Sequence, residues 1–232
     1  MFAKKKFTCF TPAGAARFLV GVAALLALSV PALAQTQTFA TGDYCTYTQG
    51  GWGAVPQGNN PGTILHNNFL AIYTSGVEVG VPGTSGFSMK FTTADGVTNY
   101  LPAGGKPKPL TADYTNPLST SSGVFGGQVL ALQLNVDFSD YGLPFPSPPA
   151  SFPLFGDLQI TGTGTSFDGM TVRQLLNEAN IRLGTNPPTT LPANLNDIVT
   201  FLNQGFDNCL PSGWAQQYLI PGLPPPDLPP PS

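Results

Sequence analysis

Charged residues are scarce in this sequence, and so are the side chains on which most enzymes depend. Only 9% of the 232 residues are charged, which is too little for a chain that stays disordered in water. The 27 glycines and 25 prolines are too many for a protein built from long helices. Because 41% of the residues are hydrophobic, a core can form. The composition therefore indicates a folded domain rich in turns.

Few residues can carry catalysis. His66 is the only histidine, so a hydrolase would need it beside a serine and an aspartate in a cleft; its context indicates a loop and a surface or capping role. No G-x-S-x-G elbow occurs, because residues 164–168 read GTSFD. We interpret Glu78 as a solvent-facing strand residue and Glu178 as the ion-pair partner of Arg182, not as a glycosidase pair. We expect no catalytic set and no cofactor.

Metal ligands are equally few. One histidine and two separated cysteines leave no zinc set. Asp137 and Asp140 could supply oxygens to Ca²⁺, but they lack the alternating ligands of an EF-hand. We interpret them as a solvated helix end and expect no metal site.

The pattern of the first 34 residues predicts a secretory signal peptide. An apolar run over residues 18–30 is followed by Ala-Leu-Ala at residues 32–34, a small-x-small cleavage site. An uncleaved anchor is the alternative, but the run is short for a membrane span and no second run of 18 apolar residues follows. Four basic residues precede the run: Lys4, Lys5, Lys6 and Arg17. We expect cleavage after Ala34 and no integral membrane segment after processing.

Cleavage would leave an acidic domain. Removing those four basic residues from the nine leaves five against twelve acidic residues, a net charge of −7. This balance argues against binding to nucleic acid or anionic membrane surfaces. We expect a single domain over residues 35–220, secreted or at the cell surface, with the periplasm as the alternative. Residues 221–232 contain seven prolines and predict a polyproline II tail, either a spacer or a ligand for a groove.

The expected compartment also predicts a disulfide. Cys9 leaves with the signal peptide, so Cys45 and Cys209 remain as an even pair in an oxidising environment. A metal or redox pair is the alternative, which the 163 residues between them disfavour. A disulfide closing so long a loop contributes about 5 kcal/mol in the chain-entropy treatment.

Two kinds of pattern divide the domain. Turn residues bound short β candidates at residues 44–48, 69–73, 77–81, 87–92 and 158–161. Apolar spacing predicts helices over residues 94–101, over residues 170–183 and after Asn194. Asp168 is the candidate N-cap of the helix over 170–183, and Asp197, three residues after Asn194, resembles a capping box.

Residues 122–138 fit both a strand and a helix. Every second residue from Leu130 to Phe138 is apolar, as in a half-buried strand. Apolar residues at 125, 129, 132 and 136 have helical spacing, but the glycines at 126 and 127 would each cost a helix about 1 kcal/mol. The spacing alone slightly favours the strand.

Three stretches carry a family resemblance. Residues 45–52 read CTYTQGGW, like a C-T-x-T-Q-G-x-W opening; residues 127–136 read GQVLALQLNV, like Q-L-x-A-x-x-L-N-V; residues 169–180 read GMTVRQLLNEAN, like G-x-T-V-x-x-L-L-x-x-A-N. Together they resemble a group of secreted bacterial and archaeal surface domains, over about residues 43–209. The commoner form continues after the tryptophan with Lys, Asn and His, where this chain has Gly53 and Ala54, so no role of those polar groups carries over.

The resemblance implies a helix over residues 122–137. We therefore expect a helix there, although the alternation of apolar residues slightly favours a strand. The expected fold is α+β, a small N-terminal β portion packed with three or four short helices and tied by the disulfide. The alternative is a mainly β sandwich with a C-terminal helical pair.

Aromatic residues suggest one kind of binding. Trp52, Tyr47 and Trp214 could stack on sugar rings, although such residues more often pack in the core. A Cys45–Cys209 disulfide would bring the two tryptophans into one neighbourhood. We expect an exported, non-enzymatic cell-surface or matrix-type protein, structural or adhesive, whose partner is a cell-envelope or extracellular glycan or protein. The alternative is a glycan-binding module built around Trp52 and neighbouring aromatics.

The intact mass of the protein purified from its host tests the expected processing. The mass should lack residues 1–34, and two thiols should react with iodoacetamide only after reduction. A full-length mass with thiols that react without reductant would contradict both the export and the disulfide.

Overall fold

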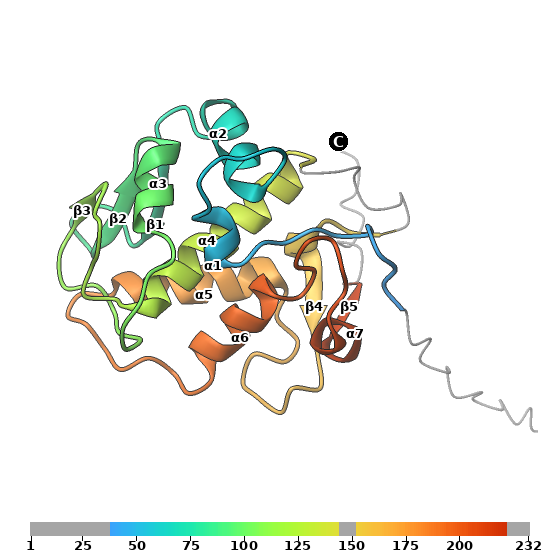
Figure 1. Cartoon of the computed structure of the whole chain (residues 1–232). Coiled ribbons are helices and arrows are strands. Elements are labelled where there is room, and N and C mark those ends of the chain that lie inside the picture. Colours follow the sequence, from blue (N-terminus) through green and yellow to red (C-terminus); the bar gives the residue numbers. More distant parts are fainter. Residues whose placement is uncertain (1–37, 144–151, 222–232) are drawn as a thin grey trace, which may run out of the picture. The chain divides into compact units, whose positions relative to one another are not determined.

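Helices form most of the fold, and two small sheets complete it (Figure 1). The computed structural model describes residues 38–143 and 152–221; the expected signal peptide and all of the expected tail after Pro221 lie outside them. The helices are α1 (Gln49–Trp52), α2 (Pro61–Ile72), α3 (Ala94–Tyr100), α4 (Val124–Asp140), α5 (Val172–Gly184), α6 (Leu195–Asn203) and α7 (Gly213–Tyr218), with a 3-10 turn η1 (Phe155–Asp157). The α+β prediction is therefore confirmed, with more helices than expected.

The two sheets are short and have different topologies. The larger sheet has the order β1 (Val77–Gly80), β2 (Ser88–Phe91), β3 (Tyr114–Thr115), with β1–β2 antiparallel and β2–β3 parallel. The smaller sheet pairs β4 (Leu158–Ile160) antiparallel with β5 (Leu219–Pro221). The alternative of a β sandwich does not form.

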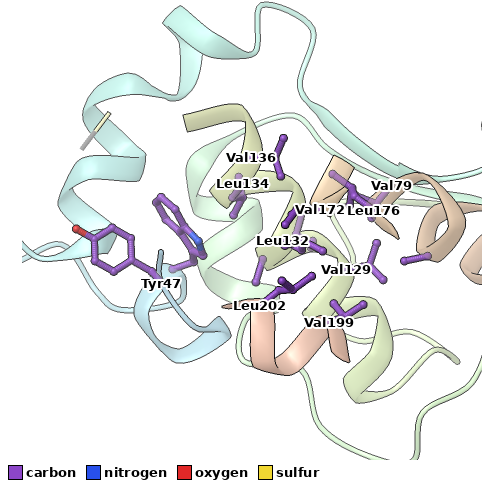
Figure 2. Close-up of a cluster of buried hydrophobic side chains, with 14 of the residues drawn as sticks. Tyr47, Val79, Val129, Leu132, Leu134, Val136, Val172, Leu176, Val199 and Leu202 are labelled. Carbon is purple, nitrogen blue, oxygen red and sulfur yellow. The ribbon is translucent and has the colours of Figure 1, made fainter. Parts of the chain in front are cut away.

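The central element is α4, which contacts α1, α5, α6, β1 and η1. Its side chains are buried on all sides, and Figure 2 shows them packed against residues of β1, α5 and α6. A helix buried all round has no single apolar stripe, which is why the sequence pattern was ambiguous. The helix expected over residues 122–137 is confirmed.

The two glycines that weakened the helix prediction let α4 approach its neighbours closely. A Cβ on Gly127 would overlap the side chain of Gln49 in α1, and one on Gly126 would meet Ser122 and Tyr100. Gln49 is buried there and accepts a hydrogen bond from the backbone N–H of Ala103 at 3.0 Å. The conformational cost of glycine is thus offset by close packing.

A buried asparagine in α4 joins three segments of the chain. Asn135 is 2% exposed; its Oδ1 accepts from the backbone N–H of Tyr47 at 2.8 Å and from Trp52 Nε1 at 3.1 Å. Its Nδ2 donates to the carbonyl of Tyr47 and to Oδ1 of Asn203, both at 2.9 Å. All four hydrogen-bonding positions of the amide are therefore used.

Several local predictions were wrong. Residues 69–73 are not a strand, because they continue and end α2, which begins with Pro61 at its first turn and the side chain of Asn60 as its cap. His66 consequently lies on a helix and not in a loop. Residues 44–48 form no strand; Thr46 makes an isolated bridge to Asp207.

Two helix starts also differ from the prediction. Thr171, not Asp168, caps α5, in a capping box with Gln174. Asn194 precedes α6 in a left-handed conformation and makes no side-chain cap bond, so the capping box expected with Asp197 does not form.

The predicted disulfide is present. Cys45 and Cys209 are bonded, and the backbone around them is tightly connected. Thr46 donates its N–H to the carbonyl of Phe206 at 2.9 Å, and its hydroxyl donates to the carbonyl of Asn203 at 2.9 Å. The disulfide therefore fixes the α6–α7 connection against the N-terminal segment.

Truncation of Asn135 should destabilise the fold strongly. Asn135→Ala leaves buried groups of Tyr47, Trp52 and Asn203 without partners, so we expect a loss of about 3–5 kcal/mol in the free energy of unfolding. Urea denaturation measures it. The control is Asn67→Ala, at an exposed position of α2, which should change stability by less than about 0.5 kcal/mol. Similar losses in both variants would contradict the role assigned to Asn135.

Candidate functional site

Two of the three predicted ligand-binding aromatics lie in the core. Trp52 is 1% exposed and Tyr47 5%. Their rings meet edge to face with centroids 5.1 Å apart, and Trp52 also packs on Phe138 at 4.8 Å. Their rings stabilise the contact between α1 and α4, so their burial favours the core over contact with a ligand for Trp52 and Tyr47.

Trp214 belongs to a different aromatic cluster, at the surface. It stacks on Phe201 with an interplanar angle of 23° and a centroid distance of 5.4 Å, and Tyr218 lies 5.5 Å away. Phe201 is 39% exposed, and the other two rings are half-buried. The disulfide has thus not brought Trp214 into the cluster of Trp52.

These three rings line a surface hollow of about 400 Å³, here called the aromatic groove. Its remaining walls come from α6, from the residue before α6 and from the loop after β4: Ile198, Asn194, Asp197, Thr163 and Thr165. The volume lies within the usual range of small-ligand sites. The residues that line the groove combine apolar ring faces with three hydroxyls, one amide and one carboxylate.

The rings of the aromatic groove are held by their helices. Trp214 and Tyr218 are four residues apart on α7, so they share one face of it. The hydroxyl of Ser212 caps α7 by accepting from Ala215 N at 3.1 Å, and the N–H of Ser212 donates to the carbonyl of Gly205 at 2.8 Å. The Cys45–Cys209 bond lies in the same connection between α6 and α7, which restricts movement of Trp214 relative to Phe201.

The opposite wall is a loop organised by one carboxylate. Asp168 accepts from the N–H and the hydroxyl of Thr163 and from the N–H of Gly164. The hydrogen bond from the Thr163 hydroxyl lowers the pKa of Asp168. The loop joins the smaller sheet next to Tyr218, whose carbonyl accepts from Thr161 N at 2.9 Å. Asp168 thus positions the two threonines.

Sequence reasoning identified Trp214 but missed the other rings of the aromatic groove. Phe201 lies off the apolar stripe of α6, which comprises Leu195, Ile198, Val199 and Leu202. A large apolar ring on the polar face of an amphipathic helix is a signal for an exposed role. The i, i+4 spacing of Trp214 and Tyr218 is a second signal.

His66 has no hydrolase geometry. Its Nε2 lies 3.0 Å from Oγ1 of Thr98, but that hydroxyl donates its own proton to the carbonyl of Ala94 at 3.0 Å. When Thr98 donates to Ala94, the imidazole is the donor to Thr98, and this contact joins α2 to α3. Asp95 lies 3.9 Å from Nδ1, beyond hydrogen-bond distance.

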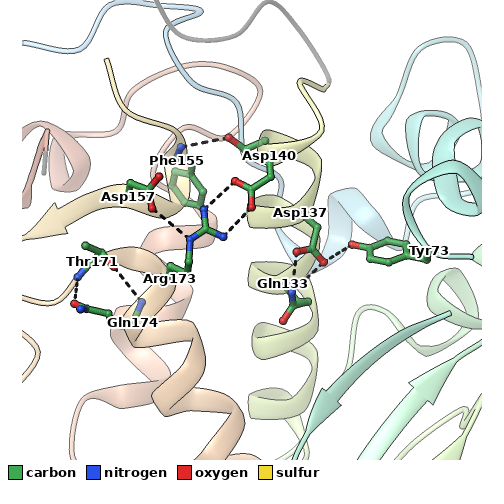
Figure 3. Close-up of polar contacts among 10 residues, drawn as sticks. Tyr73, Gln133, Asp137, Asp140, Phe155, Asp157, Thr171, Arg173 and Gln174 are labelled. Carbon is green, nitrogen blue, oxygen red and sulfur yellow. Dashed lines mark hydrogen bonds and ion pairs between the residues drawn. The ribbon is translucent and has the colours of Figure 1, made fainter. Parts of the chain in front are cut away.

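The most prominent cluster of charges connects structural elements (Figure 3). Arg173 of α5 donates two hydrogen bonds to Asp140 at the end of α4, at 2.7 and 2.9 Å, and one to Asp157 of η1 at 3.3 Å. Both oxygens of Asp140 are therefore engaged by a guanidinium. Within residues 38–143 and 152–221, no three His, Cys, Asp or Glu side chains gather to hold a metal ion.

Asp137 points away from Asp140 to different partners (Figure 3). It accepts from the Tyr73 hydroxyl at 2.8 Å and from Gln133 Nε2 at 2.9 Å. Burial raises the pKa of Asp137, and these two hydrogen bonds partly oppose the rise. Because it lines none of the hollows described, its contacts serve to join α2 to α4.

Comparison with known proteins adds no assignment. No family model matches the chain, and no curated protein or solved structure matches it. Among the described residues, no helix has the length and apolar character needed to cross a membrane.

Loss of the Asp168 carboxylate should loosen the threonine wall. In Asp168→Ala the amides of Thr163 and Gly164 should lose protection from hydrogen exchange at neutral pH. In the wild type, the ionised Asp168 carboxylate stabilises the loop fully above the usual titration range of an aspartate. This stabilisation of the loop is lost as the pH falls through the lowered pKa of Asp168. The control is Asp197→Ala, on the other side of the groove. Unchanged protection in Asp168→Ala would contradict the assignment.

Proposed function

We propose that this chain is an exported, non-enzymatic cell-surface or matrix-type protein that binds carbohydrate in the aromatic groove. The observation that carries the proposal is the surface cluster of Phe201, Trp214 and Tyr218 beside hydroxyl, amide and carboxylate groups. A sugar ring has an apolar C–H face and a rim of hydroxyls. Aromatic faces suit the former, and Thr163, Asn194 or Asp197 can exchange hydrogen bonds with the latter.

The rigidity of the groove supports a binding role. The Phe201–Trp214 stack orients both rings, and the disulfide and the Asp168 loop hold the two walls. A surface ordered before the ligand arrives loses little conformational entropy on binding.

The composition of the groove favours binding over hydrolysis. Among the described residues that line it, Asp197 is the one carboxylate, whereas glycoside hydrolysis uses two carboxyl groups on either side of the bond. Export is supported by the signal-peptide pattern, by the Cys45–Cys209 disulfide and by the resemblance to secreted surface domains. Residues 222–232 would then act as the spacer, since Pro221 belongs to β5.

Affinity electrophoresis of the full chain through gels containing hydroxyethylcellulose, dextran or polygalacturonate tests the proposal. At least one polymer should retard the protein and change its tryptophan emission, which reports on Trp214 because Trp52 is buried. Trp214→Ala should weaken this binding about tenfold or more.

The matched control is Tyr141→Ala, which removes an aromatic ring that is 54% exposed outside the groove and should leave retardation unchanged. The competing partner is a proline-rich peptide, which aromatic grooves also bind. Failure of every polymer, together with Trp214-dependent binding of a peptide of residues 222–232, would overturn the proposal in favour of a protein ligand.

A further inference from the structure

A second hollow adjoins the aromatic groove. It has a volume of about 530 Å³ and lies between residues 106–109 on one wall, residues 188–192 on the other, and the start of α6. Asn194 and Asp197 line both hollows. The two hollows therefore form one continuous surface across the N-terminal end of α6, with rings at one end and Lys106 and Lys108 at the other.

The two lysines differ from every other basic residue of the domain. After residue 34 the sequence has five basic residues, all within the described ranges. Lys90 pairs with Glu78, Arg182 with Glu178, and Arg173 with two aspartates. Within the described part of the chain, Lys106 and Lys108 have no carboxylate within ion-pair distance, although carboxylates outnumber basic residues.

The backbone that carries these lysines is fixed to the core. Lys108 N donates to the carbonyl of Ser122 at 3.1 Å, and Leu110 N donates to the carbonyl of Leu183 at 2.8 Å. Gly123, at a φ of 58°, packs directly against the carbonyl of Lys106, where a Cβ would overlap it. Both lysines are exposed, so two positive charges project from a wall of the hollow whose backbone is fixed.

Asp197 determines how a ligand must be arranged across this surface. Asp197 lines both hollows, and its carboxylate repels an anionic group placed beside it while accepting hydrogen bonds from hydroxyls. An anionic group is therefore favoured at the lysine end over a position beside Asp197. The neutral face of a neighbouring sugar then lies on Trp214.

We infer that the polysaccharide bound by this surface is anionic, carrying carboxylate or sulfate groups that pair with Lys106 and Lys108. This inference rests on the proposed carbohydrate binding and names its substrate class. Both groups are oxyanions attached to a sugar ring. The experiment distinguishes them by using one polymer that carries carboxylates and another that carries sulfates.

The test compares polygalacturonate with its methyl ester, and dextran sulfate with dextran, by affinity electrophoresis of the full chain at low and high salt. The full chain should bind polygalacturonate, dextran sulfate or both more tightly than the uncharged counterpart, and less tightly at high salt. Lys106→Gln/Lys108→Gln should weaken binding of the anionic polymer about tenfold and leave binding of the neutral counterpart unchanged.

The control variant, Lys90→Gln/Arg182→Gln, makes the same change in net charge away from the surface and should bind like the wild type. Equal losses in the two double variants would mean that bulk charge and not the lysine wall is responsible, and would overturn the inference. Trp214-dependent binding that is equally tight for charged and neutral polymers would also overturn it, while the proposed function stands. If the full chain bound none of the polymers, that result would instead contradict the proposed carbohydrate binding itself.

Discussion

The side-chain amide of Asn135 fixes the position of the central helix. Its two acceptor and two donor positions are all used, and they reach α1, the segment before α1 and the end of α6. Because these groups are buried, a rotation or a shift of α4 would leave several of them without partners, at about 1–3 kcal/mol each. An apolar helix that could otherwise slide along its neighbours is thereby held in one register.

The same set of contacts extends from the core to the surface. Asn203, a partner of Asn135, also accepts from Thr46 through its carbonyl, and Thr46 is next to Cys45. The disulfide joins Cys45 to Cys209, which lies in the segment between α6 and α7. This segment ends at Ser212, the N-cap of α7. Phe201 and Trp214 therefore sit on elements whose positions depend on one buried network, and their stacked arrangement exists before any ligand binds.

Sequence reasoning succeeded where one physical signal was dominant. The i, i+3, i+4 stripe of α5 and the pairing of Cys45 with Cys209 were predictable. The stripe of α4 was not, because a helix buried on every side has apolar residues at strand spacing as well. Of the aromatic groove, sequence reasoning singled out only Trp214, since Phe201 lies on a different helix from Trp214 and Tyr218 and their neighbourhood depends on the fold. Trp52 was considered for both the core and a ligand site, because a tryptophan beside glycines fits either, and it lies in the core.

The disulfide also decides how the domain carries mechanical tension. A pull on the two ends of residues 38–221 passes along covalent bonds from Cys45 directly to Cys209, so the covalent path bypasses the residues between them. The loaded parts are the segment before Cys45 and the segment that contains α7. They are joined by two hydrogen bonds between the side-chain amide of Gln216 and the backbone of Phe39. Gln216 accepts from the N–H of Phe39 at 2.9 Å and donates to its carbonyl at 2.6 Å. Phe201 lies inside the ring closed by the disulfide and Trp214 outside it, so stretching would draw apart the two stacked rings of the aromatic groove.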